Sequence, residues 1–218
     1  MAGNGRILYT LDGRDFRDYG IYVSDSAGII DLPKMKGVSS VSWDDYHGEE
    51  VDLRHKYYEP REITLSCFVK AENKADFVEK MSSFVLQFTK RGLSRLVIYA
   101  VDGKPLVYDV YCKDGISITK KWSDKLMVGT FKLKVIEPHP IKRVLSFSGS
   151  GRCSITLTSK KMVSVFWGDG TADEDVSGNS VIISHNYSSS GANYPVVAGC
   201  IDEIYSMNTN ASIVWDKL

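Results

Sequence analysis

The sequence contains no long apolar run, no excess of charge of either sign and no pair of neighbouring cysteines. No stretch approaches the roughly 18 consecutive apolar residues that a membrane-spanning helix needs. The 27 basic and 27 acidic side chains give a formal net charge of zero, whereas affinity for nucleic acid depends on basic groups that neutralise phosphates. We therefore expect neither insertion into a membrane nor a nucleic-acid partner.

The sequence also shows neither the pattern of a secretory leader nor the cysteine spacing of a disulfide framework. The segment Met1–Arg6 lacks the charged and then apolar residues of a leader, so we expect no signal peptide. The cysteines form neither a CxxC pair nor a metal-ligand spacing. We expect free, buried thiols in a reducing cytoplasm, and one disulfide within each half of the chain stays open as an alternative. The four cysteines are Cys67, Cys112, Cys153 and Cys200.

No group of residues has the spacing of a catalytic or cofactor site. There is no GxSxG elbow, and no glycine-rich loop opens a helix. Asp169, Asp173 and Asp175 could attract calcium, but they lack the spacing and the terminal glutamate of a calcium loop. We predict that the chain is not an enzyme and holds neither a cofactor nor a metal. The four histidines are isolated from one another: His47, His55, His139 and His185.

Most of the chain has the pattern of strands. Residues 61–70 alternate between apolar and polar side chains, which is typical of a half-buried strand. Asp102-Gly103 lies between two such segments and predicts a hairpin. The remaining expected strands of the first part are 6–11 and 20–24, the hairpin pair 93–101 and 105–113, and a second hairpin pair, 116–122 and 127–136, joined by Ser123–Lys125.

One helix is predicted over about 73–91. Asn73 can cap its start, and Gly92 after Lys90 and Arg91 suits its end. Its apolar residues recur at helical spacing and are expected to form one stripe that packs on the protein's own sheet. They are Phe77, Val78, Met81, Phe84, Val85 and Phe88.

Residues 28–51 are rich in Gly, Pro, Asp and Ser, and we expect a long loop with one strand near 38–43. Long loops in compact domains are often functional, and aromatic residues are enriched at interfaces. Trp43, Tyr46 and His47 are therefore candidate interaction residues. The alternative, that Trp43 fills its own core, is equally open because tryptophan is highly buried on average.

A boundary is predicted near residue 142, after Pro138-His139-Pro140. From Ser146 onward there are four basic and seven acidic side chains, which leaves 23 basic and 20 acidic ones before it. We call residues 1–142 the first module and residues 143–218 the second module, and we expect a protease-sensitive linker between them. Strands are expected in the second module at 153–158, 162–167, 180–185, 194–200 and 212–215.

The second module carries Phe166-Trp-Gly-Asp-Gly-Thr171, then His185-Asn-Tyr187 and Tyr194-Pro-Val-Val197. This series resembles the core signature of PKD-like domains, which are small immunoglobulin-like β-sandwiches that bind or space. The resemblance implies a structural turn at Trp167, Gly168, Asp169 and Gly170, with His185 packed beside it.

The first module resembles, in the order of its motifs, the N-terminal domain of the distal tail proteins of long-tailed bacteriophages. That family has a β-sandwich core with a helix and assembles as a hexameric ring between the tail tube and the baseplate or tip. The residues that carry the resemblance are Leu11–Phe16, Tyr19–Ile21, Pro60–Leu65, the helix, Leu93–Tyr99 and Gly129–Lys134 before Pro138.

These resemblances imply a mainly β protein with two parts, an N-terminal β-sandwich-type domain with one helix and a small C-terminal immunoglobulin/PKD-like β-sandwich. The expected function is a structural, ring-forming component of a phage or prophage tail, assembled in the host cytoplasm and located in the virion tail. Its expected partners are other copies of itself, other tail proteins and host-surface polysaccharide. The alternative is a non-phage protein that binds carbohydrate or protein through the PKD-like domain.

Overall fold

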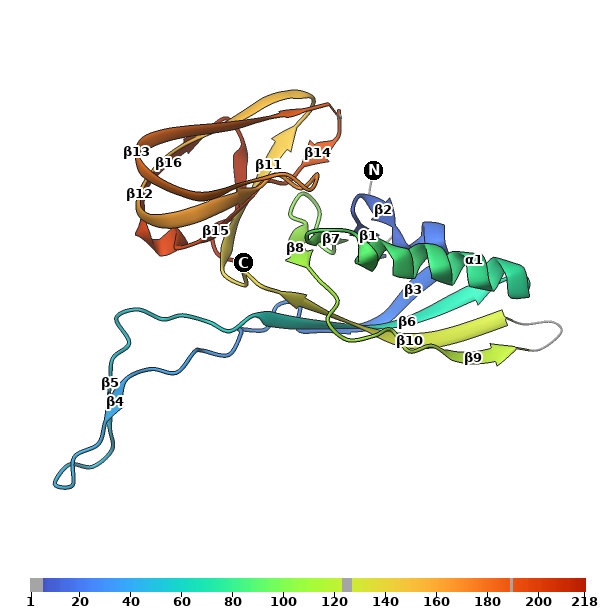
Figure 1. The fold of residues 1–218 in the computed structure, drawn as a ribbon, viewed down its shortest axis with the longest axis horizontal. Helices are drawn as coiled ribbons and strands as arrows, with labels where there is room; N and C mark the ends of the chain where they lie inside the picture. The colour runs from blue at the N-terminus through green and yellow to red at the C-terminus, as the bar shows by residue number, and fades with distance from the viewer. Residues whose placement is uncertain (1–5, 123–126, 189) are drawn as a thin grey trace.

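The computed structural model describes residues 6–122, 127–188 and 190–218, and the chain is mainly β with one α-helix, as predicted (Figure 1). In the first module, two antiparallel sheets have the orders β2-β1-β7-β8 and β3-β6-β10-β9. Their strands are β1 (Leu8–Leu11), β2 (Arg14–Asp15), β3 (Ile21–Ala27), β6 (Arg61–Ala71), β7 (Ser94–Tyr99), β8 (Leu106–Val110), β9 (Thr119–Trp122) and β10 (Met127–Glu137), with a short 3-10 helix η1 (Phe16–Tyr19).

Both predicted hairpins of the first module are confirmed. β7 pairs antiparallel with β8 around Asp102-Gly103, and Gly103 has a positive φ of 73° that suits the turn. β9 pairs antiparallel with β10. The turn Ser123–Lys125 that was predicted between them lies outside the described residues.

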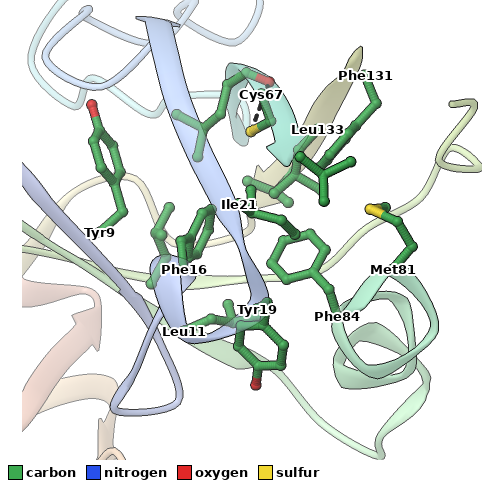
Figure 2. Packing of buried hydrophobic residues seen from close by; sticks show 14 of the residues in the cluster. Tyr9, Leu11, Phe16, Tyr19, Ile21, Cys67, Met81, Phe84, Phe131 and Leu133 are labelled. Atoms are coloured by element: carbon green, nitrogen blue, oxygen red, sulfur yellow. Dashed lines mark hydrogen bonds between the residues drawn. The ribbon is translucent and has the colours of Figure 1, made fainter. Parts of the chain in front are cut away.

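The larger core lies between the two sheets and the helix α1 (Lys74–Val85). Because side chains alternate along a strand, β6 and β10 each turn one face inward, and Cys67 pairs in register with Phe131. Figure 2 shows Met81 and Phe84 of α1 pointing toward Phe131 and Leu133 of β10. The inward face of this sheet is therefore covered, and the opposite face is not.

The helix begins as predicted but ends earlier. The Asn73 side chain accepts a hydrogen bond from the Asp76 amide at 3.0 Å, which caps the first turn. The predicted end near Gly92 is wrong, because a single 3-10 turn, η2 (Leu86–Thr89), follows the α-helix. At this end the Gln87 amide donates to the Ser83 carbonyl at 2.9 Å, so a side chain satisfies a terminal carbonyl.

One member of the predicted apolar stripe is also misplaced. Val78 is 53% exposed, while Phe77, Met81 and Phe84 are buried. Consecutive residues lie about 100° apart around a helix, so Val78 falls outside the narrow stripe that its neighbour Phe77 occupies.

The second module is one connected antiparallel sheet of seven strands around a smaller core. Two strands are unusually long, and bulges near Ser159 let β12 pair with β16 before the bend and with β15 after it. β16 was not predicted. The elements are β11 (Lys142–Ser148), β12 (Gly151–Phe166), β13 (Ala172–Tyr187), β14 (Ala192–Asn193), β15 (Val196–Gly199), η3 (Ile201–Glu203), β16 (Ile204–Thr209) and β17 (Ser212–Trp215).

The two modules touch through a third apolar cluster, which joins Val97 and Val107 of the first module to Val144 and Val196 of the second. Lys142, which lies at the predicted boundary, is buried at the junction, so this residue is not part of an exposed linker. The two modules are therefore in direct contact at the junction.

Candidate interaction sites

Residues 28–60 form a two-stranded arm that projects from the body between β3 and β6 (Figure 1). The strands β4 (Ser40–Val41) and β5 (Glu50–Val51) pair near its tip. Nearer the base, the Lys36 amide donates to the Tyr57 carbonyl at 2.8 Å, and the Glu59 amide to the Lys34 carbonyl at 2.7 Å. The sequence predicted a long loop with one strand near 38–43, and β4 lies within that range. The segment as a whole is a hairpin whose backbone is paired at these positions and whose side chains are mostly exposed.

The arm carries much of the exposed apolar surface of the chain. Of the 20 large hydrophobic side chains exposed among the described residues, eight lie on it, and Ile30 and Leu32 are 81% and 75% exposed. Exposed apolar surface of this extent marks sites of association. The eight residues are Ile30, Leu32, Val41, Trp43, Tyr46, Val51, Leu53 and Tyr57.

The three residues nominated from the sequence, Trp43, Tyr46 and His47, lie together in the turn between β4 and β5. Trp43 is 55% exposed and Tyr46 is 59% exposed, and the Tyr46 amide donates to the Trp43 carbonyl at 3.2 Å. The alternative that Trp43 fills its own core is therefore wrong. A turn at the tip of a ribbon holds these rings away from the body.

The arm tip is also acidic, a property that our reading of the sequence missed although it is visible there. No lysine or arginine lies between Lys36 and Arg54. Asp52 forms an ion pair with Arg54 at 2.6 Å, whereas the other carboxylates of the tip have no ion pair among the described residues. These are Asp44, Asp45, Glu49 and Glu50, all exposed.

The turn nominated in the second module lies between β12 and β13. Gly168 and Gly170 have φ of 96° and 92°, and the Trp167 amide donates to the Thr171 carbonyl at 3.0 Å. Asp169 Oδ1 accepts from the Thr171 amide at 3.1 Å and from its hydroxyl at 2.6 Å. The two glycines adopt left-handed backbone angles that residues with a Cβ atom rarely take. Asp169 stabilises the turn through its hydrogen bonds from Thr171.

Trp167 anchors this turn in the smaller core. Its indole Nε1 donates to Asp173 Oδ2 at 2.8 Å, and its carbonyl accepts from the Tyr187 hydroxyl at 2.7 Å. His185 stacks on the indole, with ring centroids 5.3 Å apart. The packing predicted for His185 is therefore present, and the adjacent Phe166 points the other way, into the cluster between the modules.

The charge of Asp169 is stabilised in this setting. Partial burial alone would raise the pKa of its carboxyl group, but the two hydrogen bonds from Thr171 and the nearby His185 hold the pKa below the ordinary value of 3.8. His185 Nε2 lies 2.8 Å from Asp169 Oδ2. The carboxylates of Asp169 and Asp173 thus engage different partners, and no three potential metal ligands converge within the part of the chain that the structure describes.

Arg95 of β7 joins the first module to this turn. Its guanidinium makes a bidentate pair with Asp109 of β8, with Nε–Oδ1 at 2.5 Å and Nη2–Oδ2 at 2.9 Å. Two further bonds reach the carbonyls of Phe166 and Tyr194 in the second module. A Cβ atom on Gly168 would lie 2.7 Å from Arg95 Nη1. Nothing in the alternating strand pattern around Arg95 distinguishes it, so this residue could not be nominated from the sequence.

A second buried charged group lies at the base of the arm, where the second module meets the first. Lys142 Nζ pairs with Glu137 Oε1, and Arg61 Nε lies 3.4 Å from Glu137 Oε2. Arg61 also donates to the carbonyls of Ile29 and Pro140 at 2.9 and 3.0 Å. Burial lowers the pKa of Lys142 to about 8 and raises the pKa of Glu137, while the attraction between the two opposes both shifts.

The four cysteines are free thiols in the structure. Cys67 and Cys153 are buried, and burial raises their pKa values to about 12 and about 11. Cys112 and Cys200 are half-buried. Among the described residues, none of the helices is both long and apolar enough to span a bilayer.

The fold and its surfaces define a class: a mainly β chain with one helix, two contacting modules and a projecting arm. No family model matches the chain, and no curated protein matches it. Among solved structures, it is similar to the Dit protein (gp 19.1) of phage SPP1, described as a paradigm of the hub adsorption apparatus in phages that infect Gram-positive bacteria. The identity is 10% and the TM-score 0.48, over 94% of this chain and 99% of that one. It is also similar to a chain of the phage p2 baseplate in its activated conformation with Sr, at 10% identity and a TM-score of 0.45, over 90% and 99% of the two chains.

Proposed function

We propose that this chain is a structural component of a phage or prophage tail that closes into a ring of six and adapts the tail tube to the baseplate or tip. The first module forms the ring. The second is an accessory PKD-like module that contacts other tail proteins or host-surface polysaccharide. The chain has no catalytic role, assembles in the host cytoplasm and functions in the virion tail.

The observation that carries the ring is the arm. Its eight exposed apolar side chains have no core of their own, so contact with another surface would remove them from water. In the proposed ring, the arm of each copy contacts a surface of its neighbour other than the neighbour's arm. Such a head-to-tail interface generates a closed ring when its rotation closes.

The order of motifs in the first module supports the type of assembly. These motifs run from Leu11–Phe16 through the capped helix to Gly129–Lys134 and resemble the ring-forming domain of distal tail proteins. The number of six copies and the position between tube and tip follow from that resemblance.

Light scattering coupled to gel filtration, with electron microscopy of the same fractions, tests the proposal. We expect a closed ring at high protein concentration, and we expect Trp43→Ser/Tyr46→Ser to shift it to monomer. Ile182→Ser/Tyr205→Ser is the matched control, because it removes two exposed apolar side chains of the second module and should leave the ring intact. A chain that stays monomeric at every concentration, also after chemical cross-linking, contradicts the proposal, and so do open filaments.

A further inference from the structure

The outward face of the sheet β3-β6-β10-β9 is uncovered and carries more basic than acidic side chains. Its carboxylates on these strands are Asp25, which pairs with Ser66, and Glu62, which pairs with Ile136. α1 packs on its inner face only. On the outer face, Lys132 pairs in register with Ser66 and Lys134 with Thr64, so that lysines alternate with hydroxyl groups across β6 and β10. Four exposed lysines of this face have no ion pair among the described residues. They are Lys70, Lys121, Lys132 and Lys134.

The same face carries an aromatic platform and a hollow. Tyr22 of β3 stacks on Phe68 of β6, with centroids 5.2 Å apart and planes 15° apart. Beside them lies an open hollow of about 800 Å³, which is lined by Phe68, Lys132 and Lys134, with Asp114 as the carboxylate among its lining residues. The face thus offers positive charge, hydroxyl donors and exposed ring surface to a partner.

We propose that this face receives the arm tip of a neighbouring copy of the chain. The tip carries four unpaired carboxylates beside Trp43 and Tyr46, and the face carries four lysines beside Tyr22 and Phe68, so charge matches charge and ring surface matches ring surface. The arm leaves the body at the end of the sheet opposite to the β9–β10 end (Figure 1), so each copy presents its tip away from its own face. This inference rests on the proposed ring and identifies the two surfaces that meet in it.

The charge pattern makes the contact sensitive to salt. Attraction between exposed charges is screened within about 8 Å at physiological ionic strength. We expect the oligomer to dissociate progressively as salt is raised, whereas an interface held by apolar contacts alone would be strengthened or unchanged.

Two charge-reversed variants test the pairing. Lys132→Glu/Lys134→Glu makes the face acidic, and Asp44→Lys/Asp45→Lys makes the tip basic. Each variant alone brings like charges together and should associate roughly tenfold more weakly or worse. Mixed in equal amounts, the two variants present opposite charges at every contact and should assemble in alternation. Lys74→Glu/Lys160→Glu, which changes two exposed lysines elsewhere, is the control and should assemble like the unaltered chain.

The outcomes separate the two proposals. If the unaltered chain assembles and both reversed variants assemble equally well alone, the tip does not dock on this face, while the proposed ring stands. If the variants fail alone and the mixture also fails, the pairing is likewise overturned. If the unaltered chain and the mixture are both monomeric at every concentration, the ring and the docking are overturned together. Circular dichroism of each variant establishes that it is folded before its mass is measured.

Discussion

At the scale of single residues, Gly168 sets how closely the two modules approach. Its φ of 96° disfavours any side chain, and a Cβ atom there would lie 2.7 Å from Arg95 Nη1. Arg95 cannot move aside freely, because Asp109 and two carbonyls of the second module hold its guanidinium. Gly170 has a similar φ of 92°, but nothing lies within 4 Å of its Cβ position.

This pair of glycines gives a matched test. We expect Gly170→Ala to cost about 1–3 kcal/mol of unfolding free energy through backbone strain. Gly168→Ala should cost more, because it adds a collision with Arg95. In an Arg95→Met background the difference between the two alanine variants should shrink. Chemical denaturation measures the unfolding free energy of the two alanine variants, each in the unaltered chain and in the Arg95→Met background. If Gly168→Ala and Gly170→Ala lose equal free energy in the unaltered chain, the turn does not limit how closely the two modules pack.

Asp169 predicts a dependence on pH. Its carboxyl pKa is lower in the folded chain than the ordinary 3.8, so the carboxylate contributes stability above the unfolded pKa and loses it as pH falls through the folded pKa. We expect Asp169→Asn to lower the melting temperature near neutrality and to differ less from the unaltered chain below pH 3.8. If the difference in melting temperature between Asp169→Asn and the unaltered chain stays constant as the pH falls, the effect comes from the shape of the asparagine amide and not from the lost charge. Added calcium should leave both melts unchanged.

At the scale of elements, the arm is the least self-sufficient part of the fold. An isolated two-stranded hairpin is marginally stable in water. Its base is fixed to the body, because the Ile29 carbonyl accepts hydrogen bonds from Arg61 at 2.9 Å and from the Tyr108 hydroxyl at 2.7 Å. Further out, paired backbone groups are its main support, so the arm should open locally before the body does.

Limited proteolysis tests this ranking. In the dissociated chain we expect trypsin to cut first in the arm, at Lys34, Lys36, Arg54 or Lys56, and to spare the buried junction around Lys142. Assembly should protect the arm. Mass spectrometry of the fragments identifies the sites, and early cleavage at Lys142 or Arg143 would contradict the closed junction.

The sequence predicted those elements whose signals are local. The alternation in residues 61–70, the Asp102-Gly103 turn and the Asn73 cap each act within a few residues, and each element formed. In the arm the sequence predicted one strand near 38–43, where β4 lies, but not β5 or the hairpin. The two strands bury nothing on either face, so they lack the alternation by which strands are predicted. Arg95 gains its importance from partners distant in the sequence, and Lys142 from burial between the two modules, although its ion-pair partner Glu137 is five residues away. No local pattern reports that burial or the distant contacts.

At the scale of the whole molecule, the two modules are held together by both apolar and polar contacts. The cluster of Val97, Val107, Val144 and Val196 crosses the junction. The Trp215 indole at the end of the second module donates to the Pro105 carbonyl of the first at 2.9 Å. Arg95 adds charged bonds from β7 to two carbonyls of the second module. We therefore expect the chain to unfold as one cooperative unit.

Calorimetry of variants at the Arg95–Asp109 pair tests this cooperativity. Arg95→Met alone leaves Asp109 buried without its cation and should cost about 3–5 kcal/mol. Arg95→Met/Asp109→Leu removes both charges and should cost less, because replacing a whole buried pair by apolar groups is often tolerated. It still removes the donors that reach Phe166 and Tyr194, so the single transition should broaden or divide into two, with the van't Hoff enthalpy falling below the calorimetric one.

The control is Lys217→Met/Asp202→Leu, at an exposed ion pair 2.5 Å apart within the second module, which should keep one transition. Two separate transitions in the unaltered chain would show that each module folds independently and that the junction couples nothing.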